Sequence, residues 1–515
     1  MRNQENKKLD HSLKLIVRSS FIVFIGIFIS KILIYFYRII IARQFGPEVY
    51  GLFSLSIMIV GWFIAIFSLG LVDGIVRYVS FYRGKKDMGR IRYLIKISFI
   101  TLFFSTLIAA AILFYSSDYI SLTFFHNVNL SIFLKCFSIT IPLILLAGIF
   151  LSILQAFEKI QWYSFIRNIL DNGTKLISLL ILVYLGFSTG AVITSYILGF
   201  LILLFVSYWI ARVKIPQVFA KGNLSKKSKL EIVSSLFSYS LPLVLSGLTL
   251  TLFGEIDTFA IGYFKDMVQV GIYNSALPIS VLLGIVPALL IPLFFPLITK
   301  EFAKKNNDLI TQMSKQVVKW IFILNLPFII LMVIFPGAII NLFFGADYLS
   351  AAMSLRFLSI GTFFYSIFII SENLLSMAGK TKIVFFNILT AAILNLILNI
   401  ILVPKYGISG AAFSTMVSYI LWGTLSFIQT RRHLAIVPFR RKIIQILLIS
   451  LIPTFLLIFI KQFFPLNTLT LILQGVLFFL LYTFLVIALG GLDKNDYMII
   501  NTIKKKFYKR GNAEI

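Results

Sequence analysis

The sequence is a succession of long apolar stretches, and this repetition restricts the fold more than any other feature. A helix needs ~20 apolar residues to cross a bilayer core of ~30 Å. About fourteen stretches approach that length, over 17–41, 50–78, 94–115, 131–154, 165–185, 189–210, 235–262, 271–298, 318–340, 351–376, 383–403, 409–428, 443–461 and 468–490. We therefore expect an all-α polytopic membrane protein, because helices satisfy their own backbone hydrogen bonds inside a bilayer.

The composition excludes a multidomain soluble enzyme. Of the 515 residues, 59% are hydrophobic and 13% are charged, whereas a soluble domain is about one quarter charged. No small-residue cleavage site follows the first apolar stretch, so we expect a retained helix in place of a signal peptide. The location predicted from these features is the cell membrane, with many spans.

The basic residues predict the orientation. The net charge is +28, and most of the 47 Lys and Arg lie in alternate loops and at the two ends of the chain. Cytoplasmic loops carry such an excess, so both termini are expected inside the cell. Inner-face cations also meet anionic lipid headgroups, and the high charge therefore does not indicate nucleic acid as a partner.

An internal repeat predicts two lobes. Residues 50–55 (YGLFSL) resemble 270–275 (VGIYNS), and residues 186–191 (GFSTGA) resemble 407–411 (GISGA). The copies are an even number of helices apart, which predicts parallel repeats about an axis along the membrane normal. Since both lobes lie in one chain, a monomer is expected. The predicted division is an N-terminal lobe of six helices over 1–210, a basic cytoplasmic linker over 211–234, a C-terminal lobe of six helices over 235–428, and two extra helices with a basic tail over 429–515.

The first apolar stretch carries two cations, and a third lies in the turn that follows it. Each cation near the middle of a bilayer costs roughly 2.5–3.5 kcal/mol on an insertion scale. Lys31 is predicted too deep to reach the headgroups, which favours a cavity-facing position. Arg38 faces a cavity or extends to the outer headgroups, and Arg43 follows in the turn.

The stretch over 235–262 carries two acids, Glu255 and Asp257. Residues two apart on a helix point to nearly opposite sides. One of them is expected to pair with a cation of the first stretch if the two helices face each other. Acids inside a membrane also suit coupling to an ion or a proton.

Two pairs of opposite charge are spaced at i,i+4. They are Asp73 with Arg77 and Asp171 with Lys175. This spacing puts both side chains on one face of a helix. Each pair is interpreted either as a local structural ion pair or as part of a functional site.

Prolines gather in the stretches that begin the second repeat. Pro242 lies in one stretch, and Pro278, Pro287 and Pro292 lie in the next. Proline bends a helix, which would suit a lobe that rocks, although prolines are common in membrane helices generally.

The sequence contains no pattern typical of catalysis. Its three histidines are isolated, and no phosphate-binding loop, metal-spaced Cys/His cluster or nucleophile elbow occurs. No enzyme activity, cofactor or metal is therefore expected.

Two segments resemble the opening of the Wzx-type polysaccharide-biosynthesis flippases of the multidrug/oligosaccharidyl-lipid/polysaccharide (MOP) exporter superfamily. They are residues 42–53 (ARQFGPEVYGLF) and residues 73–80 (DGIVRYVS), the latter running into 83–87 (RGKKD). The resemblance implies a V-shaped transporter with alternating access. Its substrate would be an oligosaccharide linked to a polyprenyl phosphate or diphosphate, moved from the inner to the outer leaflet.

The resemblance also implies a cationic cavity lined by the first, second, seventh and eighth helices. Lys31, Arg38 and Arg43 would bind the lipid phosphates there, in contact with membrane lipids and beside proteins of glycan assembly. This sequence departs from a symmetric cationic cavity, because its eighth stretch has no cation between Lys265 and Lys300.

Two alternatives stay open. One is a cation-coupled multidrug exporter of the MATE type, although such exporters handle cationic compounds and have twelve spans. The other is a membrane glycosyltransferase, polymerase or ligase. Such enzymes need a carboxylate-bearing external loop or a large external domain, and the predicted external loops are short.

Overall fold

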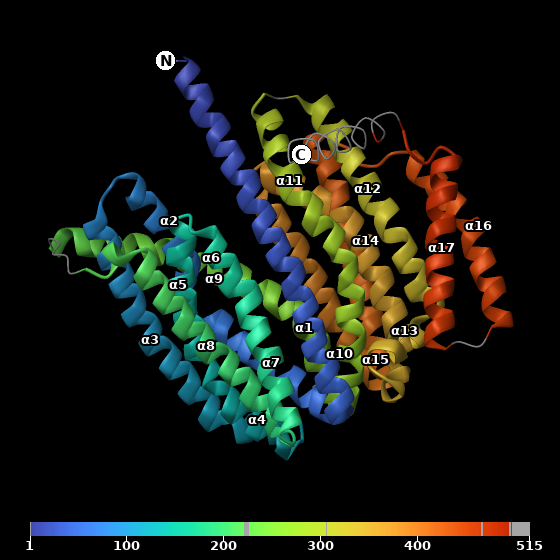
Figure 1. The fold of residues 1–515 in the computed structure, drawn as a ribbon, viewed down its shortest axis with the longest axis horizontal. Coiled ribbons are helices and arrows are strands. Elements are labelled where there is room, and N and C mark those ends of the chain that lie inside the picture. Colours follow the sequence, from blue (N-terminus) through green and yellow to red (C-terminus); the bar gives the residue numbers. More distant parts are fainter. Residues whose placement is uncertain (1, 221–225, 305, 465–466, 494–495, 497–515) are drawn as a thin grey trace, which may run out of the picture. The chain divides into compact units, whose positions relative to one another are not determined.

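The computed structural model describes residues 2–220, 226–304, 306–464, 467–493 and 496. All regular secondary structure in this part of the chain is helical (Figure 1). The α-helices are α1 (Arg2–Phe67), α2 (Leu71–Gly84), α3 (Met88–Tyr119), α4 (Val128–Ser138), α5 (Thr140–Ala156), α6 (Ile160–Ser164), α7 (Asp171–Tyr184), α8 (Gly190–Lys214), α9 (Lys226–Phe264), α10 (Met267–Val281), α11 (Ile285–Ala303), α12 (Asn307–Ile334), α13 (Pro336–Phe343), α14 (Ala352–Met377), α15 (Thr381–Leu434), α16 (Lys442–Phe463) and α17 (Thr468–Ala488).

The all-helical membrane fold predicted from the apolar stretches is confirmed. Eleven helical segments in the described residues are long and apolar enough to cross a membrane. One of these, Thr381–Leu434, contains two of the predicted stretches, and another, Ile25–Phe67, overlaps two of them. The count of fourteen spans and the orientation stay predictions.

The chain packs as two compact units. The first contains residues 1–279, 343–354 and 388–418, and the second contains 280–342, 355–387 and 419–515. The predicted division into six-helix lobes stays a prediction. Of the predicted linker, residues 226–234 are already helical as the start of α9, and 221–225 lie outside the described residues.

Glycine breaks the two longest helices where turns were predicted. Gly46 in α1 has φ 80° and ψ 178°, and Gly407 in α15 has φ 57° and ψ −136°. Both are left-handed values of φ that only glycine adopts at low cost. Each long helix is therefore two straight segments joined at a sharp bend.

Several predicted spans are not continuous helices, and those over 50–78 and 271–298 are two examples. The stretch over 50–78 breaks at Leu69 and Gly70, which have φ 50° and 63°. Glycine is needed at 70 because a Cβ there would lie 2.2 Å from the Ser240 carbonyl oxygen of α9. The stretch over 271–298 breaks at a 3₁₀ turn, Leu282–Gly284, between α10 and α11.

Side chains satisfy several carbonyl groups that prolines leave without a helical donor. Proline lacks an N–H, so the carbonyl four residues before it loses its usual partner. Asn325 donates to the Leu283 carbonyl, four residues before Pro287, at 2.8 Å. In the same way, the Tyr482 hydroxyl donates to the Ile323 carbonyl, which Pro327 frees, at 2.9 Å. These bonds tie the proline-containing helices to their neighbours.

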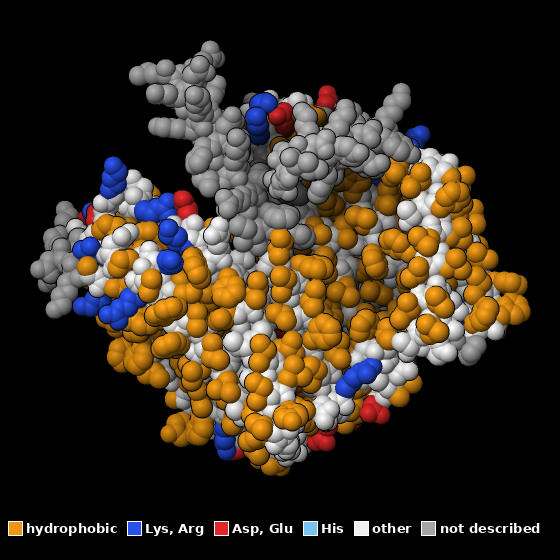
Figure 2. All heavy atoms as spheres, in the orientation of Figure 1, with side chains coloured by type: hydrophobic (Ala, Val, Ile, Leu, Met, Phe, Trp, Pro, Cys, Tyr) orange, Lys and Arg blue, Asp and Glu red, His pale blue; other side chains and the backbone are white. Residues whose placement is uncertain are grey.

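The molecular surface matches a protein embedded in lipid. Figure 2 shows hydrophobic side chains over most of the visible face, with Lys and Arg gathered where α2 and α3 meet. Large apolar side chains such as Phe455 of α16 and Phe484 of α17 are exposed. Such surface would be unfavourable in water but suits hydrocarbon. The chain is a multi-pass protein of the cell membrane.

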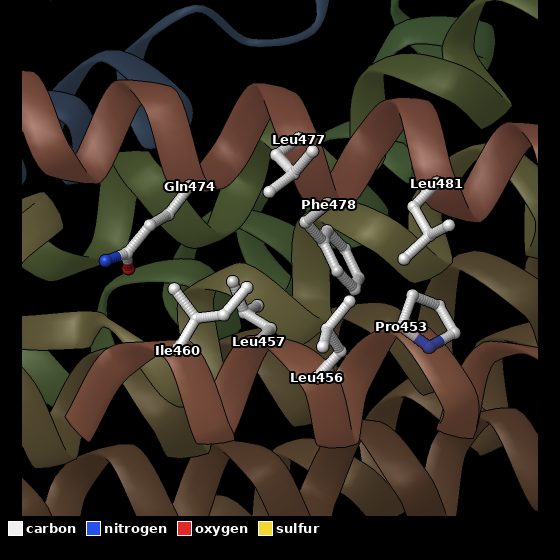
Figure 3. Close-up of a pocket in the computed structure, with 8 residues that line it drawn as sticks. All are labelled: Pro453, Leu456, Leu457, Ile460, Gln474, Leu477, Phe478 and Leu481. Atoms are coloured by element: carbon white, nitrogen blue, oxygen red, sulfur yellow. The ribbon is translucent and has the colours of Figure 1, made fainter. Parts of the chain in front are cut away.

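A small pocket lies between α16 and α17 (Figure 3). Its lining is apolar except for Gln474, whose side-chain nitrogen and oxygen have no hydrogen-bond partner among the described residues. The pocket offers no charged group, so it cannot bind a phosphate.

Candidate functional site

Lys31 lies on the side of α1 that is not packed. Neighbouring residues on the other side pack tightly: a Cβ at Gly26 would overlap the Ser164 side chain, and Asn172 donates to the Ser30 hydroxyl at 2.9 Å. Lys31 itself is exposed and forms no ion pair or hydrogen bond within the described residues. An ammonium group in this position is available to an anionic ligand.

Arg38 lies about two turns further along α1 and is half-buried. Its Nη1 is 3.5 Å from the Tyr50 hydroxyl, which in turn donates to the Asn274 carbonyl of α10 at 3.0 Å. The charge of Glu255, on α9, also interacts with the guanidinium. Arg38 is therefore held partly in place and keeps some exposed surface.

Arg43 is exposed beside the bend at Gly46. Its Nε donates to the Phe343 carbonyl at 2.8 Å, at the end of α13. The Tyr348 hydroxyl donates to the Ala42 carbonyl at 3.0 Å, four residues before the bend at Gly46. These contacts fix the turn that follows the cationic segment. The three predicted cations thus lie along one helix, and Arg38 and Arg43 are held by hydrogen bonds to other parts of the chain.

Asp257 is buried in a polar cluster, with 7% of its surface exposed. Tyr273 and Thr415 donate hydroxyl hydrogen bonds to its Oδ2. The amide groups of Asn399 and Asn395 donate to its Oδ1 at 2.8 and 3.3 Å. This one carboxylate therefore joins α9, α10 and both halves of α15.

The cluster is rich in oxygen atoms. The carboxylate, two hydroxyls and two amide oxygens are the hard ligands that alkali and alkaline-earth cations prefer. The amide oxygen of Asn399 is buried and has no partner among the described residues. The described part of the chain holds no group of three His, Cys, Asp or Glu residues able to hold a metal, so a cation here would rest on a single charge.

Glu255 and Asp257 have different neighbours, as their spacing predicts. Glu255 interacts electrostatically with Arg38, whereas the four side chains that donate to Asp257 are neutral. One acid is thus associated with the cationic helix and the other with the polar cluster.

The local ion pair expected between Asp73 and Arg77 does not form. Asp73 is exposed, and the Arg77 guanidinium lies 3.9 Å from the centre of the Tyr239 ring on α9. The guanidinium also lies 5.5 Å from the centre of the Tyr78 ring on its own helix, so its contacts are with aromatic rings. The matching pair does form in α7, where Lys175 Nζ is 2.7 Å from Asp171 Oδ1 and both side chains are buried.

The predicted bend prolines lie inside helices. Pro242 is in α9, Pro278 is in α10, and Pro287 and Pro292 are in α11. Only the break between α10 and α11 interrupts a helix near them. Whether any of them acts as a hinge stays a prediction.

Sequence reasoning missed the partners of Asp257. Asn395 and Asn399 are four residues apart in an otherwise apolar stretch, and this spacing places two amides on one helix face. That pair was a usable signal. Tyr273 and Thr415 gave no such signal, because single hydroxyl residues are common in membrane helices.

The family described as "Polysaccharide biosynthesis protein" matches residues 16–300. The match includes both the cationic helix and the two acids of α9. The chain belongs to this family. A second family, described as "MatE", matches residues 242–401.

Relatives and solved structures agree with this assignment. The chain is 25% identical to "Lipid II flippase MurJ" of Bacillus subtilis over 81% of this chain and 83% of the relative. It is also 25% identical to "Putative O-antigen transporter" of Shigella flexneri, over 74% and 89%. A solved structure of "Lipid II flippase MurJ, inward closed conformation" has a TM-score of 0.72 at 19% identity, covering 90% of this chain and 97% of that one. The chain therefore has the fold of that flippase.

Proposed function

We propose that this protein is a flippase. It moves an oligosaccharide linked to a polyprenyl phosphate or diphosphate from the inner to the outer leaflet by alternating access, for the synthesis of a surface glycan. Membership of the polysaccharide biosynthesis family supports this assignment, and two relatives are named as transporters of cell-envelope precursors. The observation that carries the proposal is an exposed ammonium, Lys31, on an apolar membrane helix of such a protein.

The charges on α1 suit a lipid phosphate. A phosphate group cannot enter hydrocarbon alone, because removing its charge from water costs many kcal/mol. Lys31 would form charge-assisted hydrogen bonds with it, and Arg38 and Arg43 would extend the cationic path along the helix. The prenyl chain stays in the bilayer, which the exposed apolar surface allows.

The polar cluster around Asp257 is the proposed coupling site. A buried carboxylate surrounded by oxygen ligands can exchange its donors for a monovalent cation or a proton. Such binding would change how α9, α10 and α15 are held together, because all three meet at Asp257. Glu255 acts separately, through the charge of Arg38.

The alternative is a cation-coupled drug exporter, and the match to the MatE family over residues 242–401 favours it. Exporters of cationic compounds need acidic cavities, whereas Lys31 and Arg38 would repel such compounds. The flippase proposal therefore accounts for more of the charged residues.

Deletion of the gene tests the two proposals in one experiment. A flippase deletion should abolish surface glycan while lipid-linked units accumulate at the inner face of the membrane. Neither effect should appear when the deletion strain carries the wild-type gene on a plasmid. Surface glycan that survives the deletion, together with reduced dye efflux, would support the drug exporter instead.

A further inference from the structure

Two helices meet backbone to backbone near the bend in α1. A Cβ added at Gly51 would lie 1.8 Å from the Met267 carbonyl oxygen, and one at Gly271 would lie 1.9 Å from the Pro47 carbonyl oxygen. No side chain fits at either position. The first turn of the helix after the bend and the first turns of α10 are therefore in direct contact, and these are the segments that the internal repeat pairs.

A hydrogen bond from a tyrosine hydroxyl stabilises this contact. Tyr50 is 0% exposed, and its hydroxyl donates to the Asn274 carbonyl at 3.0 Å. Asn274 lies four residues before Pro278, so its carbonyl has no backbone donor in α10. Tyr50 supplies the missing donor from another helix. If the two helices separate, that carbonyl loses its partner inside the membrane.

The same hydroxyl touches the cationic helix. Arg38 Nη1 is 3.5 Å from the Tyr50 oxygen. A donor to the oxygen polarises the O–H bond and strengthens the hydrogen bond that this hydroxyl donates. The charge of Arg38 therefore supports the bond between Tyr50 and Asn274 through the Tyr50 hydroxyl.

We infer that Tyr50 is a positioning residue that links phosphate binding to separation of these helices. When the substrate phosphate takes Arg38 as its partner, the Tyr50 hydroxyl loses the support of the guanidinium. Its bond to the Asn274 carbonyl weakens, and the glycine contact opens more readily. This inference rests on the proposed function, because it uses a phosphate as the ligand of Arg38.

Thiol labelling measures the separation directly. Cys136 is the single cysteine of the chain, so Cys136→Ser gives a background without thiols. Ser275→Cys then places a thiol beside Asn274, at a position that is 0% exposed. Residue 275 lies four residues after Gly271, on the face of α10 that meets the helix after the bend. We therefore expect a membrane-impermeant maleimide to react faster with this thiol when the two helices separate.

Tyr50→Phe should raise the labelling rate about tenfold, as expected from the loss of one buried hydrogen bond. Tyr37→Phe is the matched control. It removes another buried tyrosine hydroxyl of α1, which is 3.0 Å from the Ser195 hydroxyl of α8, and should leave the labelling rate unchanged. An unchanged rate in Tyr50→Phe would overturn the inference, provided that the variant keeps the wild-type melting temperature.

Pro278→Ala gives an independent test that does not depend on the stability of one variant. Alanine restores an N–H that can donate to the Asn274 carbonyl. Tyr50→Phe should then have a much smaller effect in the Pro278→Ala background than in the wild type. Equal effects in the two backgrounds would show that the hydroxyl does not act through this carbonyl.

The effect of the ligand is tested by the same labelling in proteoliposomes that contain polyprenyl diphosphate. Inorganic diphosphate serves as a second probe. The lipid should raise labelling several-fold in the wild type and not in Arg38→Ala. An equal rise in both would overturn the role of Arg38. If Tyr50→Phe raises labelling but neither probe does so, the bond from Tyr50 stands and the proposed substrate is wrong.

Discussion

The hairpin within α1 and the hairpin of α9 and α10, which we predict to be related by an internal repeat, differ in chemistry. The hairpin of α1 joins two apolar segments at Gly46 and carries cations that are exposed or half-buried. The hairpin of α9 and α10 carries Asp257, which is enclosed by neutral donors. The α1 hairpin thus presents cations that an anionic ligand can reach, whereas the α9–α10 hairpin holds its acid in a closed polar cluster.

The two hairpins suit two different tasks of a transporter, namely substrate binding and ion coupling. A substrate must reach its site and leave it. The groups that bind it therefore need exposed hydrogen-bond donors, and Lys31 has such a donor. A coupling ion needs a site that excludes other ligands and that connects several helices. Asp257 meets this requirement through α10 and α15, and the following predictions test each half of this account.

The largest effect is expected from Asp257→Asn. The amide retains the size of the carboxylate, removes its charge and turns an NH₂ group toward residues that already donate hydrogen bonds. Transport of lipid-linked oligosaccharide in proteoliposomes should fall to background. Asp266→Asn is the control, because Asp266 is exposed and its side chain accepts from the Gln269 N–H at 2.8 Å, which asparagine can also do. Normal transport by Asp257→Asn would show that the polar cluster is not the coupling site.

Lys31→Ala should lower transport by roughly tenfold or more, since a charge-assisted hydrogen bond contributes ~1.5–3 kcal/mol. Lys31→Arg should keep most of the activity because it keeps the charge. Lys85→Ala, which changes an exposed lysine over the Phe81 ring, serves as the control. The measurement is surface glycan in a strain that expresses each variant at equal level. Equal loss in Lys31→Ala and Lys85→Ala would mean that total positive charge, not position, determines transport.

A smaller effect is expected from Glu255, whose charge supports Arg38. Glu255→Gln and Arg38→Ala should each reduce transport severalfold, and the double variant should be little worse than Arg38→Ala alone. The double-mutant cycle measures this coupling. Strictly additive losses would show that Glu255 and Arg38 act independently.

The smallest effect concerns the bent helices of the second unit. Asn325→Ala leaves the Leu283 carbonyl without a donor and should cost about 1–3 kcal/mol of stability. The expected result is a lower melting temperature in detergent with little change in transport per folded molecule. Asn373→Ala is a suitable comparison, since that amide donates only to the Ile369 carbonyl of its own helix at 2.8 Å. Equal shifts in the two variants would contradict the role given to Asn325.

Much of the fold could be predicted from the sequence because a membrane helix has a simple requirement. Backbone groups must be satisfied inside hydrocarbon, so apolar stretches of sufficient length become helices. Gly46 and Gly407 marked the bends because their left-handed φ values suit glycine. The break at Gly70 was not predicted, since it depends on the approach of Ser240 from a distant part of the chain.

The site was only partly predictable for the same reason. Charges inside apolar stretches are visible in the sequence, which pointed to Lys31, Arg38 and Asp257. Their partners come from other helices, and nothing local in the sequence specifies which helices meet. Of the two pairs spaced at i,i+4, Asp171 and Lys175 form an ion pair, whereas the Arg77 guanidinium lies over the ring of Tyr239 in α9.

The most direct test of the central claim is a flipping assay with purified protein. Proteoliposomes would contain a fluorescent polyprenyl-diphosphate oligosaccharide, and a membrane-impermeant reductant would report how much of it reaches the outer leaflet. The account predicts transfer by the wild type, strong loss in Lys31→Ala and recovery in Lys31→Arg. Transfer by Lys31→Ala at the wild-type rate would contradict a phosphate-binding role for the cationic helix.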